Sequence, residues 1–312
     1  MKAMLFERYG PPEVLQLREV PKSRPHATEI LIKIHATTVR AGGWRMRKAD
    51  PISARLFNGL FKPQRVTILG MELAGEIEAV GDSVTRFHPG ERVFASTGLK
   101  FGAYAENTCL PEGAVTAIKP GNLSFVQAAA VPSGAIAALK LLKKGSIENI
   151  KNVLIYGASG SVGTYALQLA KNFGSEVTAI CGTSNLALAK SLGADRVIDY
   201  QKDDFIERTE KYNFIFDAVG RMISGFSPST FKKKLKSHGS FVSIEMDYKE
   251  CVKDLVFISK LVEAEKLRVV IDRAYPLDRM VEAHSYVEKK LKKGNVAITV
   301  EHNTKNGRDS RE

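Results

Sequence analysis

A glycine-containing segment near the middle of the chain offers the clearest chemistry. It reads Gly157-Ala-Ser-Gly-Ser-Val-Gly163 and follows an aliphatic run, Asn152 to Tyr156, that is typical of a buried strand. Apolar residues then recur at helical spacing from Thr164 to Phe173. Glycines at such a turn let a pyrophosphate approach the backbone N–H groups at the helix N-terminus. Although alanine stands at 158 in place of the usual first glycine, the context favours dinucleotide binding over an ordinary tight turn.

The next predicted strand, Glu176 to Cys181, indicates which dinucleotide is bound. A cofactor without a 2′-phosphate usually meets an Asp or Glu at the end of this strand, about 20 residues beyond the glycines. Here the strand runs into Cys181-Gly-Thr-Ser-Asn185 and contains no acid after Glu176. Hydroxyl and amide groups can donate hydrogen bonds to a phosphate, whereas a carboxylate repels it. The residues therefore predict NADP(H), with Lys190 and Tyr200 as the nearest candidates for further contacts.

These segments lie in a β-α-β-α-β run that spans residues 151–200. The chain before about residue 121 is predicted to be all-β, and Gly102 to Glu106 is expected to be one of its strands. Helical patterns begin at Ser124, which can cap the first of them. Two more strands are predicted at Tyr212 to Ala218 and Gly239 to Glu245. The pattern predicts an α/β fold in which a β domain precedes a doubly wound parallel sheet.

Composition limits the function classes. The chain has 312 residues, 44% of them hydrophobic, and its three cysteines are scattered, which favours a reducing cytoplasm over a disulfide framework. We expect no signal peptide, because the N-terminal residues read directly into a first strand. We expect no membrane segment, because the longest apolar tract is broken by polar residues and a proline. The net charge of +12 comes partly from two lysine runs, at 232–234 and 289–293. They lack interleaved aromatic residues, so we expect solvated faces rather than a nucleic-acid site.

Several ordered segments resemble the medium-chain dehydrogenase/reductase superfamily, and within it the zinc-independent branch that is similar to quinone reductases. They are Tyr9-Gly-Pro-Pro-Glu-Val-Leu15, the 69–81 segment from Leu-Gly-Met-Glu to Val-Gly, Gly90-Glu-Arg-Val-Phe94, Gly102-Ala-Tyr-Ala-Glu106, Ala128-Ala-Ala-Val-Pro-Ser-Gly134, the 157–163 turn, Leu192-Gly-Ala-Asp-Arg-Val-Ile-Asp-Tyr200 and Gly294-Asn-Val-Ala-Ile-Thr-Val300. The resemblance covers residues 1 to about 301.

The resemblance implies a fold with two domains and an active cleft between them. Residues 1–123 would form a GroES-like catalytic domain, to which 268–302 return, and residues 124–267 a Rossmann NADP-binding domain. Residues 303–312 are predicted to be a disordered tail. Relatives insert a further strand after the one ending near Glu245, and only 246–253 stand here. We therefore expect a sheet of five strands rather than six, which places the relatives' homodimer by edge pairing in question.

The resemblance also implies that the catalytic site holds no zinc. Zinc-dependent members have a cysteine where Arg40 stands and a His-Glu pair where Met71-Glu72 stands. A catalytic zinc needs three N, S or O protein ligands, and a permanently protonated guanidinium cannot be one of them. Without a metal, the protein would align NADPH with an acceptor that conjugation already activates, such as a quinone or an enone.

Two other functions remain open. One is an enoyl-thioester or alkenal reductase, which would use the same cofactor site with a different substrate pocket. The other is a non-catalytic NADPH-binding protein that contacts RNA, as some relatives are thought to do, and the net charge of +12 motivates it. A small-molecule quinone or enone is the expected partner.

The predicted site combines residues of the turn, the strand ends and the resemblance. Contacts to the pyrophosphate are predicted for Ala158, Ser159, Gly160, Ser161, Val162 and Gly163. Contacts to the adenosine end are predicted for Gly182, Thr183, Ser184 and Asn185, with Tyr200 by resemblance. Ala218, Val219 and Gly220 are predicted to approach the nicotinamide ribose, and the resemblance adds Asn295. Arg40, Trp44 and Met71 are candidates for the substrate pocket, with no catalytic residue assigned. Relatives carry Asn and Asp where Arg40 and Gly43 stand, and often a threonine where Ala137 stands. These departures bear on the choice of substrate and on the turnover rate.

Overall fold

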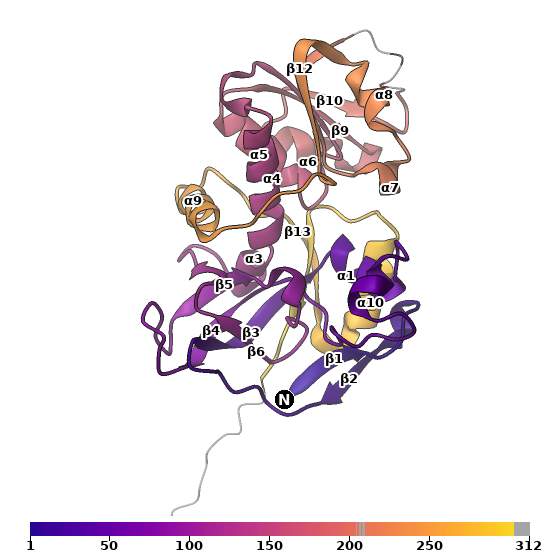
Figure 1. Ribbon diagram of the computed structural model, residues 1–312. Helices are drawn as coiled ribbons and strands as arrows, with labels where there is room; N and C mark the ends of the chain where they lie inside the picture. The colour runs from indigo at the N-terminus through magenta and orange to yellow at the C-terminus, as the bar shows by residue number, and fades with distance from the viewer. Residues whose placement is uncertain (204, 206, 208–209, 303–312) are drawn as a thin grey trace, which may run out of the picture.

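The computed structural model describes residues 1–203, 205, 207 and 210–302 (Figure 1). The predicted tail, 303–312, lies outside the described residues. Two bodies are stacked along the long axis, a β domain at the bottom of the view and a parallel-sheet domain at the top (Figure 1). The C-terminal part of the chain, in yellow, runs back into the lower body.

Fourteen strands are formed in the described residues. Their bounds are β1 (Lys2–Phe6), β2 (Leu15–Glu19), β3 (Glu29–Val39), β4 (Glu72–Val80), β5 (Arg92–Ser96), β6 (Asn107–Pro111), β7 (Val115–Ile118), β8 (Asn152–Tyr156), β9 (Glu176–Cys181), β10 (Arg196–Asp199), β11 (Tyr212–Asp217), β12 (Leu235–Ser243), β13 (Ile271–Pro276) and β14 (Asn295–Thr299).

Ten α-helices accompany them in the same part of the chain. Their bounds are α1 (Ala41–Lys48), α2 (Ala54–Asn58), α3 (Phe125–Ala129), α4 (Pro132–Lys144), α5 (Gly163–Asn172), α6 (Leu186–Ser191), α7 (Arg221–Ser224), α8 (Pro228–Lys232), α9 (Val252–Glu263) and α10 (Met280–Glu288).

The upper sheet has the order β10-β9-β8-β11-β12, and every neighbouring pair is parallel. Alternation of strands and helices produces this arrangement, because parallel strands need a crossover between them. The inner strands β8, β9 and β11 are mostly apolar and buried, since both faces of the sheet are covered there. Within the described residues no sixth strand joins β12, so the expected five-stranded sheet is confirmed.

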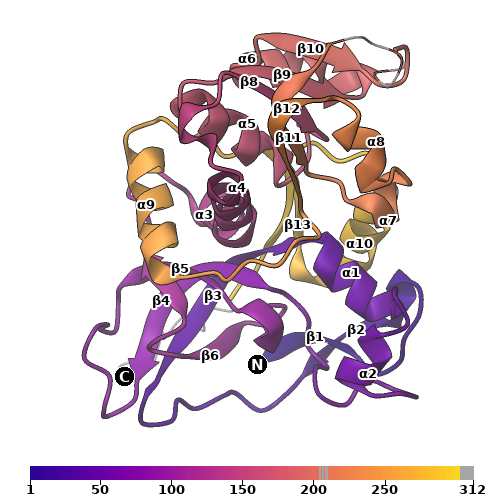
Figure 2. The ribbon, with the colours of Figure 1, turned by 45° about the horizontal axis from the view of Figure 1, so that its top comes forward.

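The lower sheet has the order β13-β14-β3-β4-β5-β7, and β6 pairs with β3. Its pairs are antiparallel except β13 with β14, which are parallel. The last two strands come from the C-terminal part of the chain, which therefore completes the sheet begun at the N-terminus. In Figure 2, α10 lies beside α1 on this lower body, and the two helices are in contact.

One predicted strand is wrong. Gly102 to Glu106 contributes only an isolated bridge, between Ala105 and Ala3, and the strand begins at Asn107. The reason is local, because Gly102 adopts a φ of 93° and a Cβ at Gly70 would lie 2.6 Å from Tyr104. Tyr104 is fully buried, so its ring holds this segment against the domain core instead of in a ladder.

The register of the upper sheet aligns the strand ends that matter for binding. Tyr156 pairs with Ile180 on one side and Asp217 on the other, and Asp217 pairs with Ser243. The segments after β8, β9, β11 and β12 therefore leave the same edge of the sheet. Ligands of open α/β sheets bind at that carboxyl edge. No helix of the described residues has the length and apolar character to cross a membrane.

The capping box at Ser124 gives a test of the fold. The Ser124 hydroxyl accepts from the Gln127 amide at 3.2 Å, and the Ser124 amide donates to the Gln127 side chain at 3.0 Å. Ser124→Ala should lower the free energy of unfolding by about 1 kcal/mol, because one orphan helix donor loses its acceptor. Urea unfolding of this variant should be compared with Ser83→Ala, at an exposed loop serine. Equal stability of the two variants would contradict the assigned cap.

Candidate active site

The turn between β8 and α5 requires glycine at both of its ends. Gly157 has a φ of 78°, and a Cβ at Gly163 would lie 2.1 Å from the Gly157 carbonyl oxygen. At Gly160 the nearest atom to an added Cβ is that same oxygen, at 3.5 Å, so the missing side chain leaves space there. The backbone of the turn is thus tightly packed at Gly163, whereas Gly160 has room beside it for a ligand.

The donors beyond this turn fit a phosphate. Among the described residues, no backbone carbonyl accepts from the amides of Ser161, Val162 or Gly163. These amides stand at the N-terminus of α5, a helix of ten residues whose dipole favours an anion there. The predicted pyrophosphate contacts are therefore chemically suited to their role, although whether they hold a cofactor stays a prediction.

The predicted adenosine contacts lie together beside this turn. Thr183–Asn185 form a 3-10 helix, and Asn185 Nδ2 donates to Ser159 Oγ at 3.1 Å. The hydroxyl of Tyr200 would lie 3.4 Å from a Cβ at Gly182, so the two residues are neighbours. Thr183 differs from the others, since its hydroxyl donates to Asp199 Oδ2 at 2.6 Å. Its proton is therefore committed to a carboxylate at the end of β10.

A lysine from the other domain reaches the same corner. Lys293 Nζ donates to the Ser184 carbonyl oxygen at 3.1 Å. Lys190, the lysine singled out from the sequence, is exposed on α6. Sequence reasoning missed Lys293 because it lies 109 residues from Ser184 and was counted with a solvated lysine run. The only signal in the sequence was its position directly before the 294–300 segment, which carries part of the family resemblance. The structure adds that Gly294 pairs with Gly160.

The 218–220 segment is held beside the glycine turn. Asp217 Oδ1 accepts from the amides of Val219 and Gly220, each at 3.0 Å. The Val219 side chain packs on Gly157, where an added Cβ would meet it at 2.3 Å. The predicted contacts near the nicotinamide ribose thus lie next to the predicted pyrophosphate contacts.

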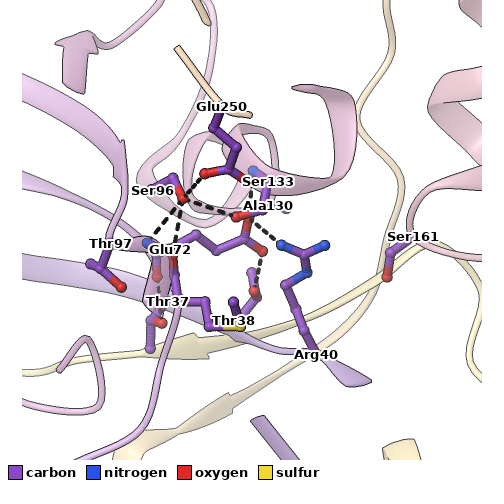
Figure 3. Close-up of polar contacts among 12 residues, drawn as sticks. Thr37, Thr38, Arg40, Glu72, Ser96, Thr97, Ala130, Ser133, Ser161 and Glu250 are labelled. Atoms are coloured by element: carbon purple, nitrogen blue, oxygen red, sulfur yellow. Dashed lines mark hydrogen bonds and ion pairs between the residues drawn. The ribbon is translucent and has the colours of Figure 1, made fainter. Parts of the chain in front are cut away.

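A buried ion pair lies where the two domains meet (Figure 3). Arg40 Nη1 is 3.6 Å from Glu72 Oε2, and the Ser133 amide donates to that oxygen at 3.0 Å. The Thr38 hydroxyl donates to the other oxygen of Glu72. Burial acts to lower the pKa of Arg40, but Glu72 and other nearby acids raise it overall, so the guanidinium stays charged.

A second acid approaches this pair from the segment between β12 and α9. Ser96 Oγ donates to Glu250 Oε2 and lies 3.4 Å from Ser133 Oγ, so the two acids are joined through serines. Burial raises the pKa of Glu250 and also that of Tyr248, and both side chains interact with Arg40. Sequence reasoning missed Glu250 because only the folded chain brings residue 250 to β5.

Of the remaining residues singled out from the sequence, one lies at the Arg40 cluster and the others are buried elsewhere. Met71 lies against Gly42, where an added Cβ would meet its sulfur at 2.8 Å, and it therefore flanks the Arg40 cluster. Trp44 is buried in the core of the β domain. Ala137 is buried inside α4, in the core of the other domain. Asn295 is buried too, and its amide donates to the Val270 carbonyl oxygen at 3.2 Å.

The described residues contain no group of three or more His, Cys, Asp or Glu side chains that could hold a metal. At the positions expected to be ligands in zinc-dependent relatives stand Arg40 and Met71. A guanidinium has no lone pair to offer, so these side chains do not fit a catalytic zinc. The absence of zinc stays a prediction that metal analysis of the purified protein can test.

Lys292 connects the glycine turn to the Arg40 region. Its Nζ donates to Ser161 Oγ and, at 2.6 Å, to the Gly294 carbonyl oxygen. Burial and the charge of Arg40 lower the pKa of Lys292 to about 8, while Asp272 and Glu72 act in the opposite direction. A cation with two acceptors thus stands beside the three free amides of the turn.

Comparison with known proteins identifies both halves of the chain. Residues 26–140 match the family described as "Alcohol dehydrogenase GroES-like domain", and residues 161–272 match the one described as "Zinc-binding dehydrogenase". A Spinacia oleracea protein named "Quinone-oxidoreductase homolog, chloroplastic" is 32% identical, over 92% of this chain and 94% of the relative. The Arabidopsis thaliana "NADPH-dependent alkenal/one oxidoreductase, chloroplastic" is 28% identical, over 96% and 79%.

Solved structures agree. The quinone oxidoreductase from Coxiella burnetii superimposes with a TM-score of 0.84 at 28% identity, covering 96% of this chain and 99% of that one. The two plant relatives named above are chloroplastic, so a cytoplasmic location stays a prediction for this chain.

The lowered pKa of Lys292 gives a pH test. Between about pH 8 and its ordinary value of 10.5, the unfolded chain binds a proton at Lys292 that the folded chain does not. Stability contributed by this residue therefore rises with pH across that window. The unfolding free energy of the native protein minus that of Lys292→Met should increase from pH 7.5 to pH 9.5, as measured by urea unfolding. Lys293→Met is the matched control, and a flat difference for Lys292→Met would contradict the assigned burial of its ammonium.

Proposed function

Because the chain belongs to the medium-chain dehydrogenase/reductase superfamily, in its quinone-oxidoreductase-like branch, we propose that it transfers hydride from NADPH to a quinone or an activated alkene without zinc. At the coarser level the chain is an NAD(P)H oxidoreductase of the quinone-oxidoreductase type. The choice of NADPH and the class of acceptor are the parts proposed here.

One observation carries the proposal. Arg40 is paired with the buried Glu72, and it stands where zinc-dependent members are expected to supply a thiolate ligand. A site that polarises a substrate with a metal ion can reduce simple carbonyl compounds, because the ion stabilises the developing alkoxide. Without that ion, the acceptor has to be activated by its own conjugation. Quinones and enones meet this condition.

The chain's own residues bind and orient the reactants. When bound, NADPH would supply the hydride. The amides of Ser161 to Gly163 and the ammonium of Lys292 are suited to the pyrophosphate, and Ser184 with Lys293 to the 2′-phosphate. Val219 and Gly220 are suited to positioning the nicotinamide end, since Asp217 fixes their amides. Such alignment can account for a large share of a rate enhancement.

The alkenal reductase alternative has an observation in its favour. A relative covering 96% of this chain is named for alkenals and enones as acceptors. Both chemistries begin with hydride transfer to a conjugated carbon, so the same cofactor site serves either. The RNA-binding alternative is weakened, because two lysines of the basic 289–293 run have partners at the predicted cofactor site.

The function is tested by following NADPH oxidation at 340 nm with a panel of quinones, enones and simple aldehydes, with a chelator present. We expect turnover with the conjugated acceptors and none with the aldehydes, and no change when the chelator is omitted. Activity that the chelator removes would overturn the zinc-free mechanism. NADPH binding without turnover on any acceptor would favour the non-catalytic alternative.

The proposed preference for NADPH is tested at Lys293. Lys293→Ala should raise the Kd for NADPH by about tenfold or more and leave that for NADH within about twofold, because loss of a charge-assisted contact to a phosphate costs roughly 1.5–3 kcal/mol. Lys266→Ala removes the same charge from an exposed position and serves as control. Kd values come from quenching of protein fluorescence. Equal losses for both cofactors would exclude Lys293 as the phosphate ligand, and Lys190→Ala then tests the remaining candidate.

A further inference from the structure

Residues 246–250, Met-Asp-Tyr-Lys-Glu, occupy the place where relatives are expected to continue the sheet. The segment has no regular secondary structure and forms no ladder with the described residues. Burial nevertheless alternates, since Asp247 and Lys249 are exposed while Tyr248 and Glu250 are partly buried. Lys144 Nζ fixes the segment by donating to the Asp247 carbonyl oxygen at 3.2 Å. The side chains of Tyr248 and Glu250 therefore face the junction between the domains.

Glu250 reaches the polar cluster around Arg40. Figure 3 shows its carboxyl group next to Ser96 and Ser133, with the carboxyl group of Glu72 and the guanidinium of Arg40 in the same cluster. Ser96 Oγ also accepts from the Gly98 amide at 3.3 Å, which fixes the hydroxyl in place. The Glu250 carboxyl group thus has a defined position close to Arg40 and Met71, two predicted substrate contacts, and its partial exposure lets it exchange protons with water.

The surroundings favour the protonated acid. Burial raises the pKa of Glu250, and the negative charge of Glu72 acts in the same direction. The hydrogen bond from Ser96 and the charge of Arg40 oppose this, but the net direction is upward. Tyr248 and Tyr165 also interact with Arg40 and Glu72, and burial raises the pKa of both phenols. Glu250 therefore keeps its proton to a higher pH than an exposed glutamate.

We propose that Glu250 is the general acid for the reduction of enones. The inference rests on the proposed function, because it needs a bound enone that has accepted hydride. Hydride addition at the β-carbon leaves an enolate, in which the former C=C electron pair is delocalised onto the carbonyl oxygen. The O–H bond of Glu250 breaks, its proton forms a new bond to the enolate, and its electron pair stays on the carboxylate. Water then returns a proton to Glu250.

Quinones provide an internal comparison. Reduction of a quinone gives a hydroquinone anion, which is stabilised by its aromatic ring and can take its proton from water. An enolate is much more basic and gains more from a positioned acid. Glu250 should therefore matter for enones and little for quinones. A merely structural role, in which Glu250 only ties the 246–250 segment to β5, would affect both acceptors alike.

The experiment compares Glu250→Gln with Asp247→Asn, the same change at an exposed position of the same segment. We expect Glu250→Gln to lower kcat for an enone by about 100-fold or more, the usual contribution of a general acid. Its kcat for a quinone and its Kd for NADPH should stay within about threefold. The enone kcat of the native protein should fall as pH rises through the pKa of Glu250, and the variant should lose this dependence.

Two further measurements separate Glu250 from its neighbours. With 2-methylcyclopent-2-enone, a positioned acid delivers the proton to one face of the α-carbon, so the enantiomeric excess should fall in Glu250→Gln. Infrared difference spectra of the cofactor-free protein should show a protonated carboxyl band that is absent from the variant. Equal losses on enones and quinones, or full activity of Glu250→Gln beside an inactive Tyr248→Phe, would overturn the proposal. If the native protein reduces neither acceptor, the proposed function itself fails, and the infrared band then decides whether Glu250 is protonated.

Discussion

The buried pair of Arg40 and Glu72 is the interaction on which the junction depends. Glu72 lies on β4. Its carboxylate accepts hydrogen bonds from the Thr38 hydroxyl on β3 and the Ser133 amide on α4, and it forms an ion pair with Arg40 just before α1. One side chain thus connects the antiparallel sheet to the first long helix of the other domain. Removing one partner of such a pair costs roughly 3–5 kcal/mol, because the other charge stays buried without compensation. An intact pair of this kind adds little net stability, because burying two charges offsets their attraction. Its main effect is to fix the positions of the side chains around it.

The same pair determines what chemistry is available. A guanidinium supplies a fixed positive charge but accepts no ligand, so this part of the junction can orient and stabilise anions without binding a cation. Around it, the turn after β8, the Asp217-anchored segment after β11 and the C-terminal lysines converge at one edge of the parallel sheet. The predicted binding groups thus come from strand ends, while the proposed general acid comes from a connecting segment.

The sequence predicted the parts of this arrangement that depend on local patterns. The glycine turn, the five parallel strands and the Ser124 cap follow from periodicity, turn residues and a missing segment, and they agree with the structure. The sequence did not predict Lys292, Lys293 or Glu250, because each has its hydrogen-bond partner more than 100 residues away along the chain. Gly102 to Glu106 was misjudged for a related reason, since its alternation reflects packing of Tyr104 and not pairing in a ladder.

The shortened sheet has a consequence for behaviour in solution. Because β12 forms the outer edge, its outward row of backbone groups would be a template for another chain. Two features of β12 disfavour pairing with another chain: a register shift opposite β11 and a left-handed backbone at His238. Both interrupt a straight edge. Lys236 adds a charge in the exposed part of the strand, and the lysine run at 232–234 precedes it. Lysines at such an edge disfavour pairing with another chain, which gives part of the positive charge on this domain a structural reason that needs no polyanionic partner.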